Sequence, residues 1–264
     1  MGSIPNNTTT IKSHALKVFI NDVGKAVSCL NTSAVGLDAV EKGYEKPESL
    51  NISWNPEDRE SAARIARKFI IESTLVRVTE AFGEFANSLA SLPKFATLKE
   101  SWQRENIKKA DRYEQLAKSI MTENTDSFLI AAVCLMANWR NKIVHPSSSK
   151  ATISKLQIQI FENSSLIIFE KYAGLKTKKL IEDFEKNKPT LKDITSLISM
   201  TINLARQLDN GINYSSSKDV ESSITHYKLD GVIEKIIRET SKNKVEASIR
   251  RLYVIRESWV FKSL

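Results

Sequence analysis

Residues 126–146 read DSFLIAAVCLMANWRNKIVHP, the most strongly apolar stretch of the chain. Its part from position 128 to 137 is entirely apolar, which is too long for an ordinary strand and too short to cross a bilayer. Such a run predicts a helix buried on nearly all sides. The closing proline disfavours helical geometry in the residue before it and ends that helix. Arg140, Asn141 and His145 are therefore expected at the exit of a buried helix.

The segments on either side of this stretch predict an all-α protein. Only 8 Gly and 6 Pro occur, and apolar residues recur three and four positions apart rather than alternating. Four or more helices joined by short links favour a bundle. We expect helices over about 13–30, 34–44, 56–92, 97–120, 126–145, 153–172, 177–186, 190–208, 229–240 and 245–261.

The longest of these helices has a clear start signal. Asn55 is placed to cap it, and Pro56 suits the first helical position. Its expected apolar stripe includes Ile65 and Phe69, and its other face carries acidic residues. Within the next helix, the TLKE segment at 97–100 is typical of a capping box.

The predicted organisation has three parts. Residues 1–12 are polar and expected to be disordered, 13–188 form the helical bundle, and 189–264 form a C-terminal helical region. No membrane span is expected. The chain carries a net charge of +8, of which +2 lies in residues 1–149 (19 basic, 17 acidic) and +6 in residues 150–264 (20 basic, 14 acidic). A basic surplus of this size favours a polyanionic partner such as RNA.

The hexapeptide RNKIVH at 140–145 resembles the signature of the HEPN superfamily, an Arg and a His separated by four to six residues, often with Asn directly after the Arg. This resemblance implies a helical bundle and a metal-independent endoribonuclease without a cofactor. It also implies a composite site across a homodimer, a toxin or anti-phage defence role in a prokaryotic cytoplasm, and an antitoxin or sensor protein as partner. In a subgroup of HEPN toxins a Tyr follows the His by two residues. Here Ser147 stands at that place, which argues against the antitoxin that modifies this Tyr.

The residue types suit RNA cleavage by the ribose 2′-hydroxyl. His145 can take or give a proton near neutral pH, Arg140 can pair with phosphate oxygens, and Asn141 can orient His145 or hold a phosphate oxygen. On a continuous helix, residues five apart lie about 140° from one another, which separates Arg140 from His145. We expect Pro146 to loosen that last turn, and a two-fold dimer to supply the second proton carrier.

Other residues are weaker candidates for the same chemistry. Glu80 and Glu84, on the long helix, are candidates to pair with Arg140. Arg250, Arg251 and Arg256, on the basic last helix, are candidates to contact RNA. The sequence contains no glycine-rich phosphate loop, no nucleophile elbow and no zinc-ligand spacing.

Three alternatives remain open from the sequence. Arg140 can serve as a helix C-terminal partner while His145 packs against the bundle. The protein can be a non-catalytic HEPN module that binds a partner protein or nucleic acid. A DNA-binding regulator is the least supported reading, because no segment has the features of a recognition helix.

Overall fold

The computed structural model describes residues 13–121, 126–147 and 151–212, together with positions 231, 234 and 238. All regular elements of these residues are helices, which confirms the all-α prediction. The expected disordered residues 1–12 and the expected helices 229–240 and 245–261 lie outside the described residues, apart from those three positions.

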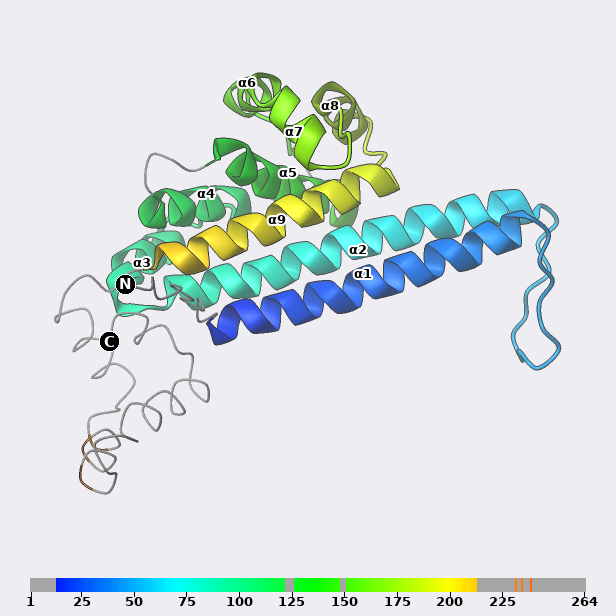
Figure 1. Ribbon diagram of the computed structural model, residues 1–264, viewed down its shortest axis with the longest axis horizontal. Coiled ribbons are helices and arrows are strands. Elements are labelled where there is room, and N and C mark those ends of the chain that lie inside the picture. The colour runs from blue at the N-terminus through cyan, green and yellow to red at the C-terminus, as the bar shows by residue number, and fades with distance from the viewer. Residues whose placement is uncertain are drawn as a thin grey trace, which may run out of the picture.

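Two long helices form an antiparallel hairpin along one side of the molecule (Figure 1). Helix α1, His14–Glu41, is capped by the Ser13 hydroxyl, which accepts from the backbone N–H of Leu16 at 3.0 Å. Helix α2, Arg59–Ala90, returns beside it. It starts at Asp58, whose carboxylate accepts from Ser61 N–H at 3.0 Å, so the predicted cap at Asn55 is wrong by one turn.

The apolar helix predicted from the sequence lies at the centre of the fold. It is α5, Ser127–Val144, and it packs against α2, α4, α6 and α9. Ten of its residues are buried, because every face of the helix meets a neighbour. The shared core contains large side chains from four helices: Phe19 of α1, Phe82 and Leu89 of α2, Trp139 of α5, and Leu197 and Leu204 of α9.

Helix α9, Leu191–Gly211, runs along α1, α2 and α5 and shares their core. Thr190 and Asp193 form a capping box at its start, and near its end Asp209 accepts from the Ser13 backbone N–H at 3.3 Å. The boundary predicted after residue 188 therefore does not end the bundle: the first helix assigned to the C-terminal region belongs to it.

The helix predicted over 97–120 is in fact two helices. A short 3₁₀ turn, η1 (Pro93–Phe95), leads into α3 (Ala96–Arg104), which has no side-chain cap, and α4 (Lys109–Ile120) follows after a bend. Asn106 adopts a left-handed backbone conformation with φ 48°, which ends helical geometry between them. The bend gives α4 an independent direction and places its N-terminus beside α5.

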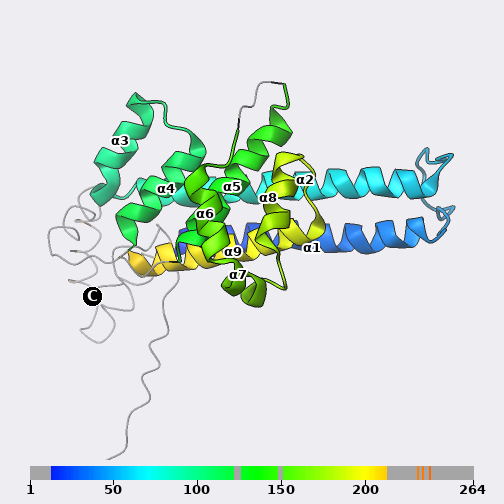
Figure 2. The same cartoon turned by 90° about the horizontal axis from the view of Figure 1, so that it is seen from above.

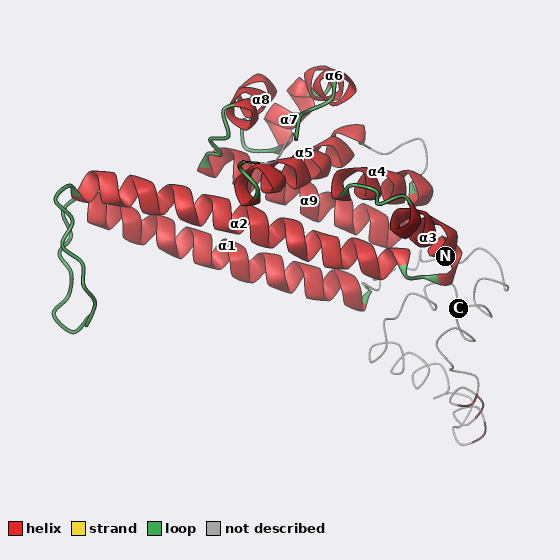
Figure 3. Cartoon of the chain, turned by 180° about the vertical axis from the view of Figure 1, so that it is seen from behind, coloured by secondary structure: helices red, strands yellow, loops and turns green. Residues whose placement is uncertain are grey.

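The helix predicted over 153–172 also divides, at Ser164, into α6 (Lys155–Asn163) and α7 (Ser165–Lys171). These two helices and α8 (Thr177–Glu185) form an outer layer on the side of α5 and α9 away from the hairpin (Figures 1 and 3). Lys142 of α5 donates to the backbone oxygen of Phe184 at 2.9 Å, which ties α8 to the end of α5.

The end of the hairpin that carries the 42–58 connection extends past the other helices (Figure 2). Ile65 and Phe69 of α2 lie there, and they are 69% and 70% exposed. The prediction that they belong to the core stripe is therefore wrong, because no other described helix reaches far enough to cover them.

Candidate functional site

The candidate site lies where α5 leaves the core. Trp139 is fully buried, and its ring meets that of Phe184 edge to face at a centroid distance of 5.6 Å. The next residue, Arg140, is partly buried, and His145 five positions later is exposed. The burial of α5 up to Trp139 fixes where the three polar residues of the hexapeptide emerge.

The last turn of α5 brings His145 back toward Arg140. The His145 backbone N–H donates to the Asn141 oxygen at 2.9 Å, but its φ of −127° and ψ of 60° are not helical. Pro146 accounts for this, since the residue before a proline is displaced from helical geometry. Helix α5 therefore ends at Val144, as the sequence predicted, and His145 is free of the helical spacing.

Arg140, Asn141 and His145 lie together at this exit. Nη1 of Arg140 donates to Oδ1 of Asn141 at 3.1 Å and lies 3.5 Å from Nε2 of His145. Because a guanidinium only donates, Nε2 of His145 is the acceptor in a hydrogen bond at this contact. His145 is exposed, so the alternative in which it packs into the bundle does not hold.

Glu80 of α2 holds the other side of the Arg140 guanidinium. Nε of Arg140 lies 2.8 Å from Oε1 of Glu80, a close ion pair whose N–H direction falls outside hydrogen-bond geometry. Nζ of Lys109, at the start of α4, donates to Oε2 of the same carboxylate at 2.6 Å. One carboxylate thus joins α2, α4 and α5.

The charges around Glu80 set its protonation state. Burial raises the pKa of this carboxyl, but the hydrogen bond and charge of Lys109 and the charge of Arg140 outweigh it, so the pKa lies below its ordinary value. Glu80 is therefore an anion at neutral pH, and it keeps the guanidinium of Arg140 in place beside His145.

The remaining sequence candidates behave differently. Glu84 lies one turn further along α2, is exposed, and makes no ion pair with Arg140 among the described residues. Arg250, Arg251 and Arg256 lie outside the described residues. Of the two acidic candidates, only Glu80 meets the hexapeptide.

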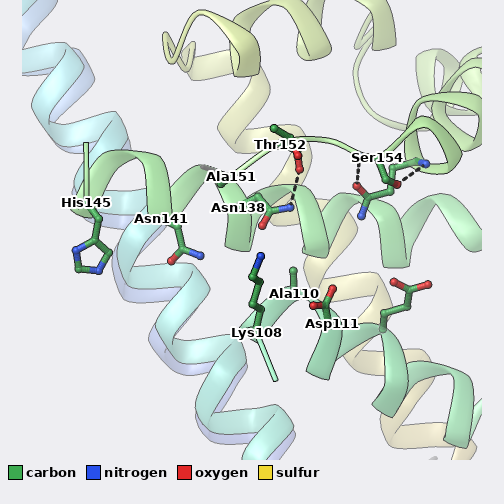
Figure 4. Close-up of a pocket in the computed structure, with 11 residues that line it drawn as sticks. Lys108, Ala110, Asp111, Asn138, Asn141, His145, Ala151, Thr152 and Ser154 are labelled. Carbon is green, nitrogen blue, oxygen red and sulfur yellow. Dashed lines mark hydrogen bonds between the residues drawn. The ribbon is translucent and has the colours of Figure 1, made fainter. Parts of the chain in front are cut away.

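A polar pocket of about 590 Å³ opens beside the three residues (Figure 4). Asn141 and His145 line one side of it, and Asn138 lies on the same face of α5 because it precedes Asn141 by three positions. Side chains of α4 point toward this face from below in Figure 4. The remaining lining residues come from α4 and its N-cap, from the segment before α6 and from α6 itself: Lys108, Ala110, Asp111, Glu114, Ala151, Thr152, Ser154 and Gln157.

Sequence reasoning missed the contributions of α4 to this site. The sequence predicted one helix over 97–120 and singled out none of Lys108, Lys109 and Asp111, because the bend at Asn106 that turns them toward α5 has no clear sequence pattern. Asn138 was findable, since the spacing 138, 141, 145 follows one helix face.

No family model, no curated protein and no solved structure matched the chain. Within the described ranges, no helix combines the length and the apolar character needed to cross a membrane. Over the same residues, His, Cys, Asp and Glu side chains form no group of three suited to hold a metal ion.

Proposed function

We propose that the protein is an endoribonuclease that cleaves RNA without a metal ion, with Arg140 and His145 as its catalytic residues. The observation that carries the proposal is the 3.5 Å separation of Arg140 Nη1 and His145 Nε2 beside a polar pocket that His145 lines. A partly buried cation that can bind phosphate thus lies next to an exposed proton carrier. The net charge of +8 favours an RNA partner by steering and counterion release.

In the proposed reaction His145 is the general base. Once the guanidinium of Arg140 pairs with the phosphate, Nε2 of His145 is free to take the proton of the ribose 2′-hydroxyl, while the 2′-oxygen bonds to phosphorus and the bond from phosphorus to the 5′-oxygen breaks. The products are a 2′,3′-cyclic phosphate and a 5′-hydroxyl end. Arg140 pairs with the non-bridging oxygens and stabilises the charge that builds there.

The 5′-oxygen needs a proton from a second group. The other described histidine, His14, lies at the start of α1 and lines a different cavity with Phe85 and Asp22. In the proposal a homodimer brings a second copy of the hexapeptide to the site, and its His145 gives the proton. This makes the active species a dimer of two incomplete sites.

The test is a cleavage assay on total RNA and on tRNA in EDTA. Wild-type protein is expected to cut, and His145→Ala and Arg140→Ala are each expected to lose roughly a hundredfold or more of that activity. His14→Ala and Arg206→Ala are matched controls, because both residues are exposed and lie outside the site; they should cut like wild type. Equal cutting by all five proteins would locate the activity elsewhere or in a contaminant.

A second assay tests the dimer. Sedimentation should show two copies per particle at the concentrations where RNA is cut, and activity should fall on dilution below the dimer dissociation constant. A fully active monomer would rule out the composite site.

The ion pair between Arg140 and Glu80 also suits a non-catalytic module, in which Arg140 fastens α2 to α5 near a binding surface. Such a module would bind RNA or a protein and cut neither. RNA binding that weakens steeply with salt, together with intact RNA after long incubation with wild type, would favour this second function.

A further inference from the structure

The pocket beside the hexapeptide is built from two facing rows of polar side chains. His145, Asn141 and Asn138 form one row along α5 and its end, and two side chains from the start of α4 project toward them, Lys108 at its N-cap and Asp111 in its first turn (Figure 4). Its volume of about 590 Å³ falls within the range of small-molecule and cofactor sites. A nucleotide is therefore of a suitable size for it.

Two of these side chains have hydrogen-bonding capacity that the fold does not use. Within the described residues, neither the carboxylate of Asp111 nor the ammonium of Lys108 makes an ion pair or side-chain hydrogen bond. Glu114, one turn further along α4, is instead paired with Lys118 at 2.7 Å. The pocket thus offers a carboxylate with two acceptor oxygens and, near it, an ammonium that can donate.

On the α5 side, the amides are partly used. Nδ2 of Asn138 donates to the Thr152 backbone oxygen at 3.2 Å, and Oδ1 of Asn141 accepts from Arg140 at 3.1 Å. These bonds fix both amides and leave Oδ1 of Asn138 as an acceptor and Nδ2 of Asn141 as a donor. The row is held in position before any ligand arrives.

We propose that this pocket binds the guanine base of the nucleotide on the 5′ side of the cleaved phosphate. The Watson–Crick edge of guanine presents N1–H and N2–H₂ donors next to the O6 acceptor. Asp111 can accept from both donors, and Lys108, the residue directly before α4 and three positions before Asp111, can donate to O6. Uracil and cytosine lack this arrangement, and adenine has an acceptor at N1 where guanine has a donor.

The pocket residues follow the order of the parts of a nucleotide. Those proposed to act on the ribose and phosphate lie at one end, and those proposed to bind the base lie nearer the other. His145 lies at one end of the row on α5, next to Arg140, where the ribose and phosphate stand in the proposed reaction, and Asp111 lies nearer the other end of that row (Figure 4). The Watson–Crick edge is accessible only in single-stranded RNA, so the substrate class is single-stranded RNA with guanosine before the cut. This inference rests on the proposed ribonuclease function, but its test does not require cleavage.

The test is calorimetric titration of the wild-type chain with the 3′-monophosphates of guanosine, adenosine, cytidine and uridine. Guanosine 3′-monophosphate should bind roughly tenfold or more tightly than the other three. Asp111→Asn should abolish the preference, because an amide offers one acceptor oxygen instead of two. Lys108→Gln should weaken guanosine binding in particular. Asp38→Asn, the same change in an exposed residue of α1, is the matched control and should bind like wild type.

The proposal would be overturned if wild type bound all four nucleotides equally or bound none. It would also be overturned if an Asp111→Asn variant with the melting temperature of wild type kept the guanosine preference. The two proposals fail separately. Guanosine selectivity in a protein that leaves RNA intact would support the guanine pocket and reject the ribonuclease function. Cleavage after all four bases alike would support the ribonuclease function and reject the guanine pocket.

Discussion

Nη1 of Arg140 lies 3.5 Å from Nε2 of His145, although five positions of the chain separate the two residues. A continuous helix would place them about 140° apart around its axis. The approach exists because α5 ends at Val144 and His145 takes a non-helical conformation before Pro146. The proline is therefore a positioning residue for the candidate site.

Pro146→Ala should separate the pair without unfolding the protein. With the restriction on His145 removed, the helix can continue by one residue and carry the imidazole around its axis. Cleavage is expected to fall roughly tenfold to a hundredfold, with the melting temperature unchanged or raised. The His145 ring resonances in a long-range nitrogen–proton spectrum give a readout independent of activity. Pro47→Ala, in the exposed connection of the hairpin, is the control.

Glu80→Gln should cost stability in a pH-dependent way. The carboxylate pairs with Lys109 at 2.6 Å and Arg140 at 2.8 Å, and its pKa is lowered in the folded state. The stability it contributes is therefore fully present above the pKa of an unfolded Glu, about 4.3, and is lost as the pH falls through the folded pKa. We expect a loss of roughly 1 kcal/mol in the free energy of unfolding at pH 7, since the pair is only partly buried.

Urea unfolding of wild type and Glu80→Gln between pH 3 and pH 7 measures this effect. The difference between the two proteins should be constant above about pH 5 and shrink below about pH 4. Glu84→Gln, one turn away and exposed, should match wild type throughout. A difference that grows as the pH falls would contradict the sign of the pKa shift.

The sequence predicted α5 and its C-terminal end, because an unbroken apolar run of this length is stable as a helix only when it is buried on all sides. It did not distinguish Glu80 from Glu84 as the partner of Arg140. The two lie one turn apart on α2, about 6 Å along the axis, and only the packing of α2 against α5 decides which carboxylate reaches the guanidinium. That packing depends on residues far apart in the chain, which no local pattern records.

The break at Asn106 was equally hidden. The segment 97–120 has helical spacing throughout, and Asn is tolerated within helices as well as in left-handed turns. Nothing in this spacing therefore singles out Lys108, Lys109 and Asp111, which the bend presents to α5. The pocket residues of α4, the helix that follows this bend, can be recognised only when the bend is known.

Phe69 and Phe82 share the apolar pattern of α2 but should differ greatly in their effect on stability. Phe82 is 1% exposed and packs against Phe19, Phe85 and Tyr113, whereas Phe69 is 70% exposed on the extended end of the hairpin. Phe82→Ala should cost about 3–5 kcal/mol, and Phe69→Ala less than about 0.5 kcal/mol. Urea unfolding measures both. A large loss for Phe69→Ala that depends on protein concentration would show that a second copy covers this end of the hairpin.

Gly83→Ala should destabilise the protein even though alanine is the better helix former by about 1 kcal/mol. A Cβ at position 83 of α2 would lie 2.8 Å from the hydroxyl oxygen of Tyr113, closer than van der Waals contact allows. The Tyr113 ring is buried against Phe82 and cannot easily move aside. We expect a loss of roughly 1–3 kcal/mol, measured by urea unfolding.

Tyr113→Phe removes the atom that causes the clash. The buried hydroxyl has no hydrogen-bond partner within the described residues, so this change alone should be neutral or slightly stabilising. The double variant Gly83→Ala with Tyr113→Phe should then recover the stability lost by Gly83→Ala and gain from the alanine. A double-mutant cycle with no coupling between the two positions would show that the cost of Gly83→Ala arises elsewhere. Coupling of the expected sign would locate it at this one contact between α2 and α4, beside the carboxylate that holds Arg140.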